Sequence, residues 1–165
     1  MSDFSVSYLG RLRQRVGHEL LLCPGAQVLV VRQDKHVLVQ RRADSGVWEI
    51  PAGACEPGQS FATAAVAELA QEAGIVAEPS DLEPFASLSD PSVHTLHYPN
   101  GDRVHAFALC FVLRVTGAAA TSTDGEALEH RWCLPTLIPE PVHGPTRVVL
   151  DLFARYEQTG KFQAR

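Results

Sequence analysis

Apolar residues recur at two spacings along the chain, and these spacings separate expected helices from expected strands. A spacing of three to four residues in segments 1–17, 61–73 and 148–156 predicts three amphipathic helices. Runs of valine, leucine and phenylalanine predict strands at 26–32, 36–41, 82–88, 93–98, 104–115 and 129–134. Segment 48–51 predicts a short strand at most, because it ends in proline. Pro24-Gly25 predicts a break before the first strand.

The helix expected at 61–73 has recognisable signals at both ends. Ser60 is a typical N-cap, and Gly74 is typical of the residue just beyond a helix C-terminus. Helices alternate with strands along the chain, and no internal repeat is visible. We therefore expect a single domain of the α/β class (α+β by some schemes), with a mixed β-sheet between helices.

The N-terminal helix expected at 1–17 carries an apolar stripe that must pack on something. Its arginines, Arg11, Arg13 and Arg15, fall mostly between the apolar positions and are expected on a solvated face. The stripe packs either on the domain itself or on a second copy of the chain. A homodimer formed through this helix or through a strand edge is therefore left open.

Composition narrows the class of protein. The chain has 165 residues, of which 45% are hydrophobic and 20% charged, as is ordinary for one globular domain. With 14 basic and 19 acidic residues its net charge is −5, which argues against binding nucleic acid. The longest apolar run, 106–113, is too short to cross a membrane, and no secretory signal is visible. The four cysteines are widely spaced, so we expect free thiols and a cytoplasmic protein.

The segment from Trp48 to Ile75 carries the candidate chemistry. Glu68 and Glu72 are one helical turn apart, with Gln71 beside them, so all three project to one side of the helix. Two carboxylates so placed can bind a hard cation such as Mg²⁺. Taken alone the pair is weak evidence, because glutamates four residues apart usually form a solvated helix face.

The surrounding pattern resembles the Nudix box, the loop and helix signature of a hydrolase family. The consensus is Gly, five residues, Glu, seven residues, then Arg-Glu-U-x-Glu-Glu-x-Gly-U, where U is aliphatic. Six positions of segment 53–75 match it: Gly53, Glu68, Leu69, Glu72, Gly74 and Ile75. Three depart from it: Gln59, Ala67 and Gln71. With similar flanks the resemblance covers about residues 26–137, and it implies that 1–165 is a single Nudix domain with a Nudix-like α/β/α sandwich.

The resemblance also implies an activity and its residues. Family members use divalent cations, Mg²⁺ or Mn²⁺, to cleave the pyrophosphate linkage of nucleoside diphosphate derivatives. Glu68, Glu72 and Gln71 would then be metal ligands, and the catalytic residues would be Glu72 and Glu126, Glu126 as a further ligand or as the base. The substrate, a small nucleotide, would contact Arg41 or Arg42, Gly53 and Tyr98, whose ring could stack on a base.

The departures from the consensus leave two functions open. Gln59 and Ala67 replace a Glu and an Arg that are expected to pair, so no unpaired charge remains. Gln71 is more serious, because an amide in place of a carboxylate removes one negative charge from the metal site. The sequence thus predicts a hydrolase with a weakened metal site; the alternative is a catalytically silent module that binds a nucleotide and regulates a partner.

Overall fold

The computed structural model describes residues 6–98, 100–117, 120, 125 and 127–165. Its helices are α1 (Tyr8–Val16), α2 (Phe61–Ala73), α3 (Pro91–His94) and α4 (Gly144–Thr159), with short 3₁₀ turns at Pro79–Asp81 and Pro135–Leu137. Its strands are β1 (Leu20–Arg32), β2 (Val37–Arg42), β3 (Trp48–Glu49), β4 (Ala52–Ala54), β5 (Glu83–Leu88), β6 (Thr95–His97), β7 (Arg103–Val115), β8 (Ala127–Cys133) and β9 (Gln163–Ala164). Within these residues, no helix has both the length and the apolar character to span a membrane.

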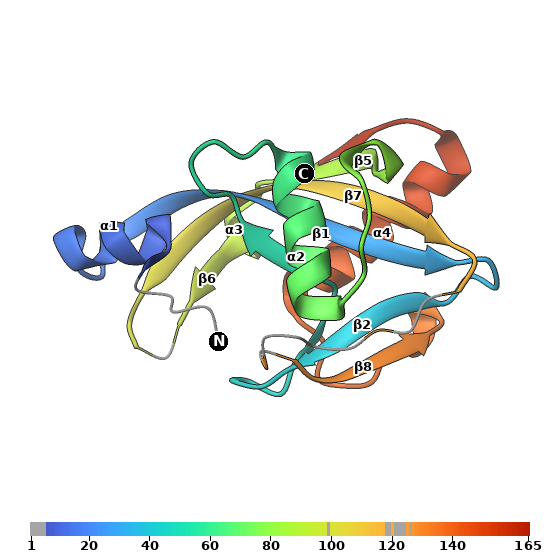
Figure 1. The fold of residues 1–165 in the computed structure, drawn as a ribbon, viewed down its shortest axis with the longest axis horizontal. Coiled ribbons are helices and arrows are strands. Elements are labelled where there is room, and N and C mark those ends of the chain that lie inside the picture. Colours follow the sequence, from blue (N-terminus) through green and yellow to red (C-terminus); the bar gives the residue numbers. More distant parts are fainter. Residues whose placement is uncertain (1–5, 99, 118–119, 121–124, 126) are drawn as a thin grey trace.

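The strands form one mixed sheet, as the sequence predicts (Figure 1). The main order is β3-β2-β1-β7-β5-β9, with β4 paired to β1, β6 to β7 and β8 to β2. At the centre, β1 and β7 run parallel over thirteen residue pairs, from Leu20 opposite Arg103 to Arg32 opposite Val115. Most other pairs are antiparallel. The long central pair is the frame on which the remaining elements are placed.

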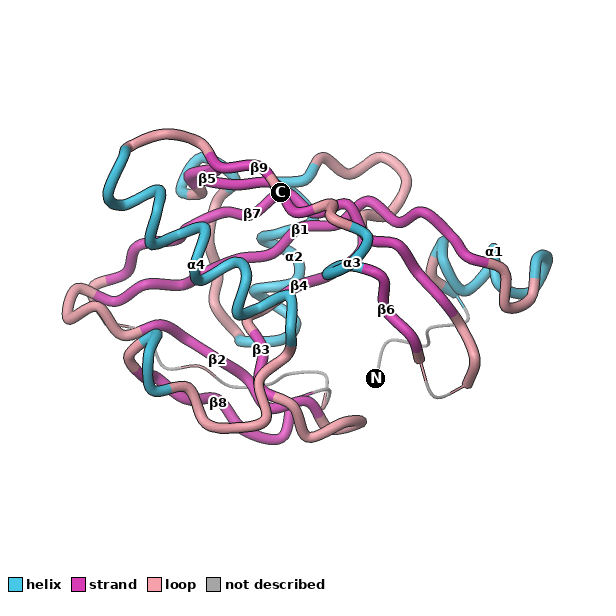
Figure 2. Tube along the Cα trace, turned by 180° about the vertical axis from the view of Figure 1, so that it is seen from behind, coloured by secondary structure: helices cyan, strands magenta, loops and turns pink. Residues whose placement is uncertain are grey.

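Both faces of this sheet are covered, because β1 is apolar on both sides. Val28 and Val30 lie in the same core cluster as Leu69 of α2. Leu29 belongs to the other cluster, together with Val149 of α4. A strand buried on both faces is expected to lack polar alternation, and β1 does. Figure 2 shows α4 in front of the sheet and α2 behind it, which confirms the predicted arrangement of a mixed sheet between helices.

Two local predictions were wrong, and one strand was missed. Pro24-Gly25 does not break the chain, since β1 begins at Leu20 and the Pro24 carbonyl accepts a hydrogen bond from the Cys55 N–H. Segment 93–98 is only half strand, because α3 ends at His94 before β6 begins. The Asp90 carboxylate caps the start of that helix by accepting a hydrogen bond from the Ser92 N–H. The third difference is β4, which the sequence pattern does not indicate.

Helix α1 is joined to β1 and β7 through one of its arginines, which is buried. Arg13 donates to the carbonyls of Gly17, Glu19 and Arg103, and its Nε lies 3.5 Å from an Asp102 oxygen. The expectation that this arginine is solvated was wrong, because its guanidinium donates to backbone carbonyls at the place where α1 meets β1 and β7. Arg11 and Arg15 are exposed, as expected.

Candidate active site

The ends of α2 fix which way its polar side chains point. Ser60 accepts from the Thr63 N–H while the Thr63 hydroxyl accepts from the Ser60 N–H, a capping box at the start of the helix. Gly74 ends the helix in the left-handed conformation at φ 64°. With both ends set, Glu72 is buried and Glu68 is half-buried.

The two glutamates meet the backbone of β4. Glu72 Oε2 accepts from the Ala52 N–H at 3.0 Å. The Glu68 carboxylate lies so close to Gly53 that a Cβ there would sit 2.0 Å from Glu68 Cδ. Only glycine lets the carboxylate approach this closely. Gly53 therefore belongs to the site because it has no side chain.

The acidic groups around β4 repel one another. Burial raises the pKa of Glu72 well above its usual value, and the charges of Glu68 and Glu49 raise it further. Burial also raises the pKa of Glu49, against the opposing effect of Arg42. Such a group of carboxylates lowers its repulsion by binding a cation.

The donor set fits one hard cation. Carboxylate oxygens are the ligands that Mg²⁺ prefers, and Glu68 and Glu72 supply them from one helix. In the part of the chain that the structure describes, no group of three or more His, Cys, Asp or Glu side chains is arranged to hold a metal. Glu126, the expected further ligand or base, lies outside the described residues.

A cleft of about 480 Å³ is lined in part by β4. Its walls come from β1, β2, β3, β4, β6, β7, α3 and the start of α4, and Leu9 of α1 contributes to it. Ala52 and Gly53 line it and also contact the two glutamates, so β4 connects the cleft to the carboxylates. Glu68 and Glu72 do not themselves line it.

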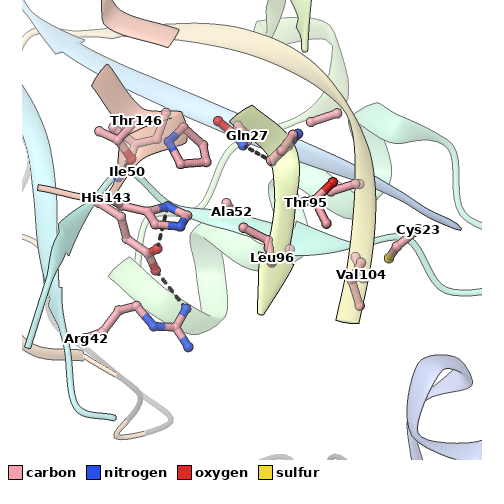
Figure 3. A pocket seen from close by; sticks show the side chains of 18 of the residues that line it. Cys23, Gln27, Arg42, Ile50, Ala52, Thr95, Leu96, Val104, His143 and Thr146 are labelled. Carbon is pink, nitrogen blue, oxygen red and sulfur yellow. Dashed lines mark hydrogen bonds and ion pairs between the residues drawn. The ribbon is translucent and has the colours of Figure 1, made fainter. Parts of the chain in front are cut away.

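An ion pair between half-buried Arg42 and buried Glu49 lines this cleft (Figure 3). Arg42 Nη1 lies 3.0 Å from Glu49 Oε1, and Arg42 Nη2 lies 2.6 Å from Asp44. On the other side, His143 Nδ1 is 3.5 Å from Glu49 Oε2. Burial, followed by the Arg42 charge, lowers the pKa of His143 to about 4, so its imidazole is neutral at pH 7. The group presents a fixed guanidinium to the cleft.

The structure brings some of the predicted residues together and separates others. Arg42, Gly53 and Tyr98 line the cleft. Arg41 points elsewhere, with its Nε 3.3 Å from the Gly46 carbonyl, as alternation along a strand requires. Gln71 is exposed on α2 and is not among the residues that line the cleft.

Sequence reasoning missed Glu49 and His143. Glu49 carries a usable signal, because it is a charged residue between the bulky apolar Trp48 and Ile50. A carboxylate buried at such a position must have a partner. His143 carries no comparable signal, since it reaches the site only through the fold of a proline-rich connection.

Known proteins share both the pattern and the fold. Residues 21–153 match the family model described as NUDIX domain. Human 8-oxo-dGDP phosphatase NUDT18 is 27% identical over 157 residues, which cover 92% of this chain and 43% of that protein. A Bacillus subtilis protein named "Putative 8-oxo-dGTP diphosphatase" is 38% identical over 116 residues, covering 70% of this chain and 68% of that protein. The chain thus spans less than half the length of the mammalian relatives it matches.

Solved structures agree on the fold. An ADP-ribose pyrophosphatase from Streptococcus suis has a TM-score of 0.64 at 20% identity, covering 87% of this chain and 98% of that one. The NUDIX domain of Shewanella oneidensis NrtR, complexed with ADP ribose, has a TM-score of 0.64 at 16% identity, covering 86% of this chain and 90% of that one. The resemblance seen in segment 53–75 is therefore confirmed. By its family model and its relatives, the chain belongs to the Nudix hydrolase family.

Proposed function

We propose that this chain hydrolyses the pyrophosphate linkage of a nucleoside diphosphate derivative with the help of Mg²⁺ or Mn²⁺. The observation that carries the proposal is the meeting of Glu68 and Glu72 with the β4 backbone, at the wall of a cleft of about 480 Å³. A helix face that merely contacted solvent would not need Gly53 opposite Glu68.

The residues of the chain have separate tasks in this proposal. Glu68 and Glu72 would hold the cation, which would neutralise phosphate oxygens and acidify a water molecule. The Ala52 N–H keeps the Glu72 carboxylate oriented. Arg42 places a positive charge in the cleft for the phosphates, and Tyr98, 39% exposed at its rim, offers a ring for the base. Glu126 remains our proposed base or further ligand.

We propose that the site binds its cation weakly because it carries too little negative charge. Gln71 contributes no negative charge, so the cation is held by two carboxylates where the family usually presents three. Burial of Glu72 adds to the effect, because a raised pKa means that protons compete with the cation. We expect turnover that needs a higher cation concentration than a complete Nudix box would.

For the substrate we propose an oxidised purine nucleoside diphosphate, 8-oxo-dGDP. The support is the name of the human relative, an 8-oxo-dGDP phosphatase, and that of the Bacillus subtilis relative, which acts by its name on 8-oxo-dGTP. The Streptococcus suis structure carries ADP-ribose in its name. A panel should therefore contain 8-oxo-dGDP, 8-oxo-dGTP, dGDP and ADP-ribose.

The test measures release of phosphate or phosphomonoester from this panel with Mg²⁺ and with Mn²⁺. Glu72→Gln is the test variant, and Glu157→Gln, a glutamate on α4 away from the cleft, is its matched control. We expect Glu72→Gln to lose at least 100-fold in activity while its Tm holds or rises, because the change removes like-charge repulsion. Full activity of Glu72→Gln would overturn the proposal.

The second candidate is the nucleotide-binding module without hydrolysis, which the missing charge at Gln71 favours. Its signature is a rise in Tm with a panel nucleotide and no release of product. The two measurements on the same protein separate the candidates.

A further inference from the structure

The deep wall of the cleft contains a polar pair that the proposed chemistry does not use. Gln27 of β1 is 6% exposed and His94 of α3 is 3% exposed, and both line the cleft. Gln27 Nε2 lies 3.1 Å from His94 Nε2. The neighbours of Gln27 on its strand, Ala26 and Val28, are apolar and buried, so the amide is the polar exception there.

The second hydrogen bond of His94 decides which atom of this pair is the donor. His94 Nδ1 lies 3.2 Å from the Leu88 carbonyl, which can only accept, so Nδ1 carries the hydrogen. Burial lowers the pKa of His94, and a neutral ring has only one N–H. His94 Nε2 is therefore an acceptor, and Gln27 must donate to it through its amide nitrogen.

This arrangement fixes the orientation of the Gln27 amide. If the amide turned over, its oxygen would face the lone pair of His94 Nε2, and two acceptors would oppose each other. Figure 3 shows the Gln27 nitrogen joined to its partner and the oxygen on the other side of the amide. That oxygen, Oε1, is buried and has no hydrogen-bond partner among the described residues. A buried acceptor without a partner is costly, and a ligand that reached it from the cleft that Gln27 lines, and donated to it, would recover the loss.

We propose that Gln27, held by His94, is the specificity-determining residue that accepts a hydrogen bond from N7–H of an 8-oxopurine base. The inference rests on the proposed function, because it takes its substrate from there. Guanine presents N7 as an acceptor. Oxidation at C8 places a hydrogen on N7, which becomes a donor. Gln27 Oε1 therefore favours the oxidised base and opposes the ordinary one.

The geometry places this residue beside the proposed chemistry. Gln27 pairs with Ala52 across β1 and β4, and Ala52 is the residue whose N–H holds Glu72. A base at Gln27 and a cation at Glu72 would thus be separated by one strand. The cleft that Gln27 and Ala52 line has room for a nucleoside.

The test compares three nucleotides on the full chain. They present a donor (8-oxo-dGDP), a C–H group (7-deaza-dGDP) and an acceptor (dGDP) at position 7. We expect affinity to fall in that order, with 8-oxo-dGDP bound roughly 10- to 100-fold more tightly than dGDP. Equal affinity for all three would overturn the inference. So would affinity for dGDP at or above that for 7-deaza-dGDP, because repulsion between two acceptors would then be absent.

Two variants of Gln27 separate recognition from packing. Gln27→Met keeps the length of the side chain but has no oxygen, and should lose at least tenfold of the preference for 8-oxo-dGDP over dGDP. Gln27→Glu keeps an acceptor, and a carboxylate beside His94 favours the doubly protonated imidazole, which donates from both ring nitrogens; this variant should therefore retain the preference. Gln163→Met, a half-buried glutamine on β9 outside the cleft, is the matched control and should behave as the native chain does. A Gln27→Met protein that is folded and keeps the preference would refute the role, and if it does not fold, the three-nucleotide series on the native chain decides.

Binding and turnover are measured separately, by calorimetry and by product release. Selective binding of 8-oxo-dGDP without hydrolysis would preserve the inference and remove the proposed activity. Hydrolysis with no dependence on Gln27 would do the reverse.

Discussion

Gly53 offers a sharp test of the site, because one methyl group should remove function and leave the fold intact. A Cβ at this position would lie 2.0 Å from Glu68 Cδ and 2.1 Å from Glu68 Oε1. Ordinary contact begins at about 3.4 Å, so the carboxylate must move by roughly 1.4 Å. It can do so, because it is the far end of a flexible side chain. A displacement of about 1 Å can cost on the order of 100-fold in rate, which is the loss we expect in kcat/KM.

Two other glycines make the matched controls for Gly53→Ala. A Cβ at Gly25 would lie 2.6 Å from the Gly53 carbonyl oxygen, which cannot move away as the end of a flexible side chain can, because it belongs to the backbone. Gly25→Ala should therefore lower the free energy of unfolding by about 1–3 kcal/mol. A Cβ at Gly144 meets nothing within 4 Å, so Gly144→Ala should be neutral. Gly53→Ala itself should change stability by less than about 1 kcal/mol.

The assay is a Mg²⁺ titration of hydrolysis, with urea unfolding beside it. If Gly53→Ala acts only by displacing Glu68, then the double variant with Glu68→Ala should be no worse than Glu68→Ala alone. Additive losses would refute the reasoning, and so would full activity in Gly53→Ala.

Three further predictions concern other parts of the molecule. Arg13→Met should lower the free energy of unfolding, measured with urea, by roughly 2–4 kcal/mol, because it leaves three carbonyls without their donor. The control Arg15→Met changes an exposed arginine and should have little effect, and equal effects of the two variants would contradict this prediction. Gln71→Glu should raise activity several-fold at low Mg²⁺, and an unchanged Mg²⁺ titration would argue against a weakened site. Burial raises the pKa of the Cys23 thiol to about 11, so its alkylation, followed by mass spectrometry, should accelerate about tenfold per pH unit from pH 7 to 10; a flat profile would contradict that pKa.

The sequence predicts best the features that depend on neighbouring residues. Helix α2 begins and ends where Ser60 and Gly74 indicate, since caps act within one turn. The two-faced burial of β1 follows from its apolar run at 28–31. The Pro24-Gly25 pair led to a wrong prediction of a chain break, because the glycine is needed for close contact with β4 and does not form a turn. That contact is with a residue 28 positions away and has no local signal.

The candidate site divides in the same way. Glu68 and Glu72 could be found from their spacing and from the box around them. Arg42 could be distinguished from Arg41 only once the strand had a known inner face. The Gln27–His94 pair joins residues 67 positions apart, and it exists because a histidine that looked like part of a strand ends a short helix. Polarity inside an apolar strand was the one hint at Gln27.

The parallel pairing of β1 with β7 also determines when the protein can fold during its synthesis. Each residue of β1 pairs with one 83 positions later, from Leu20 with Arg103 to Arg32 with Val115. At about 5–20 residues per second, a ribosome takes roughly 4–17 s to make the partner of a β1 residue that has already been made. During that interval the valine-rich strand can pair only with β2 and β4, and one of its edges stays open. A nascent chain stopped before Val115 would therefore carry the whole Nudix box and still lack the strand that completes its central pair.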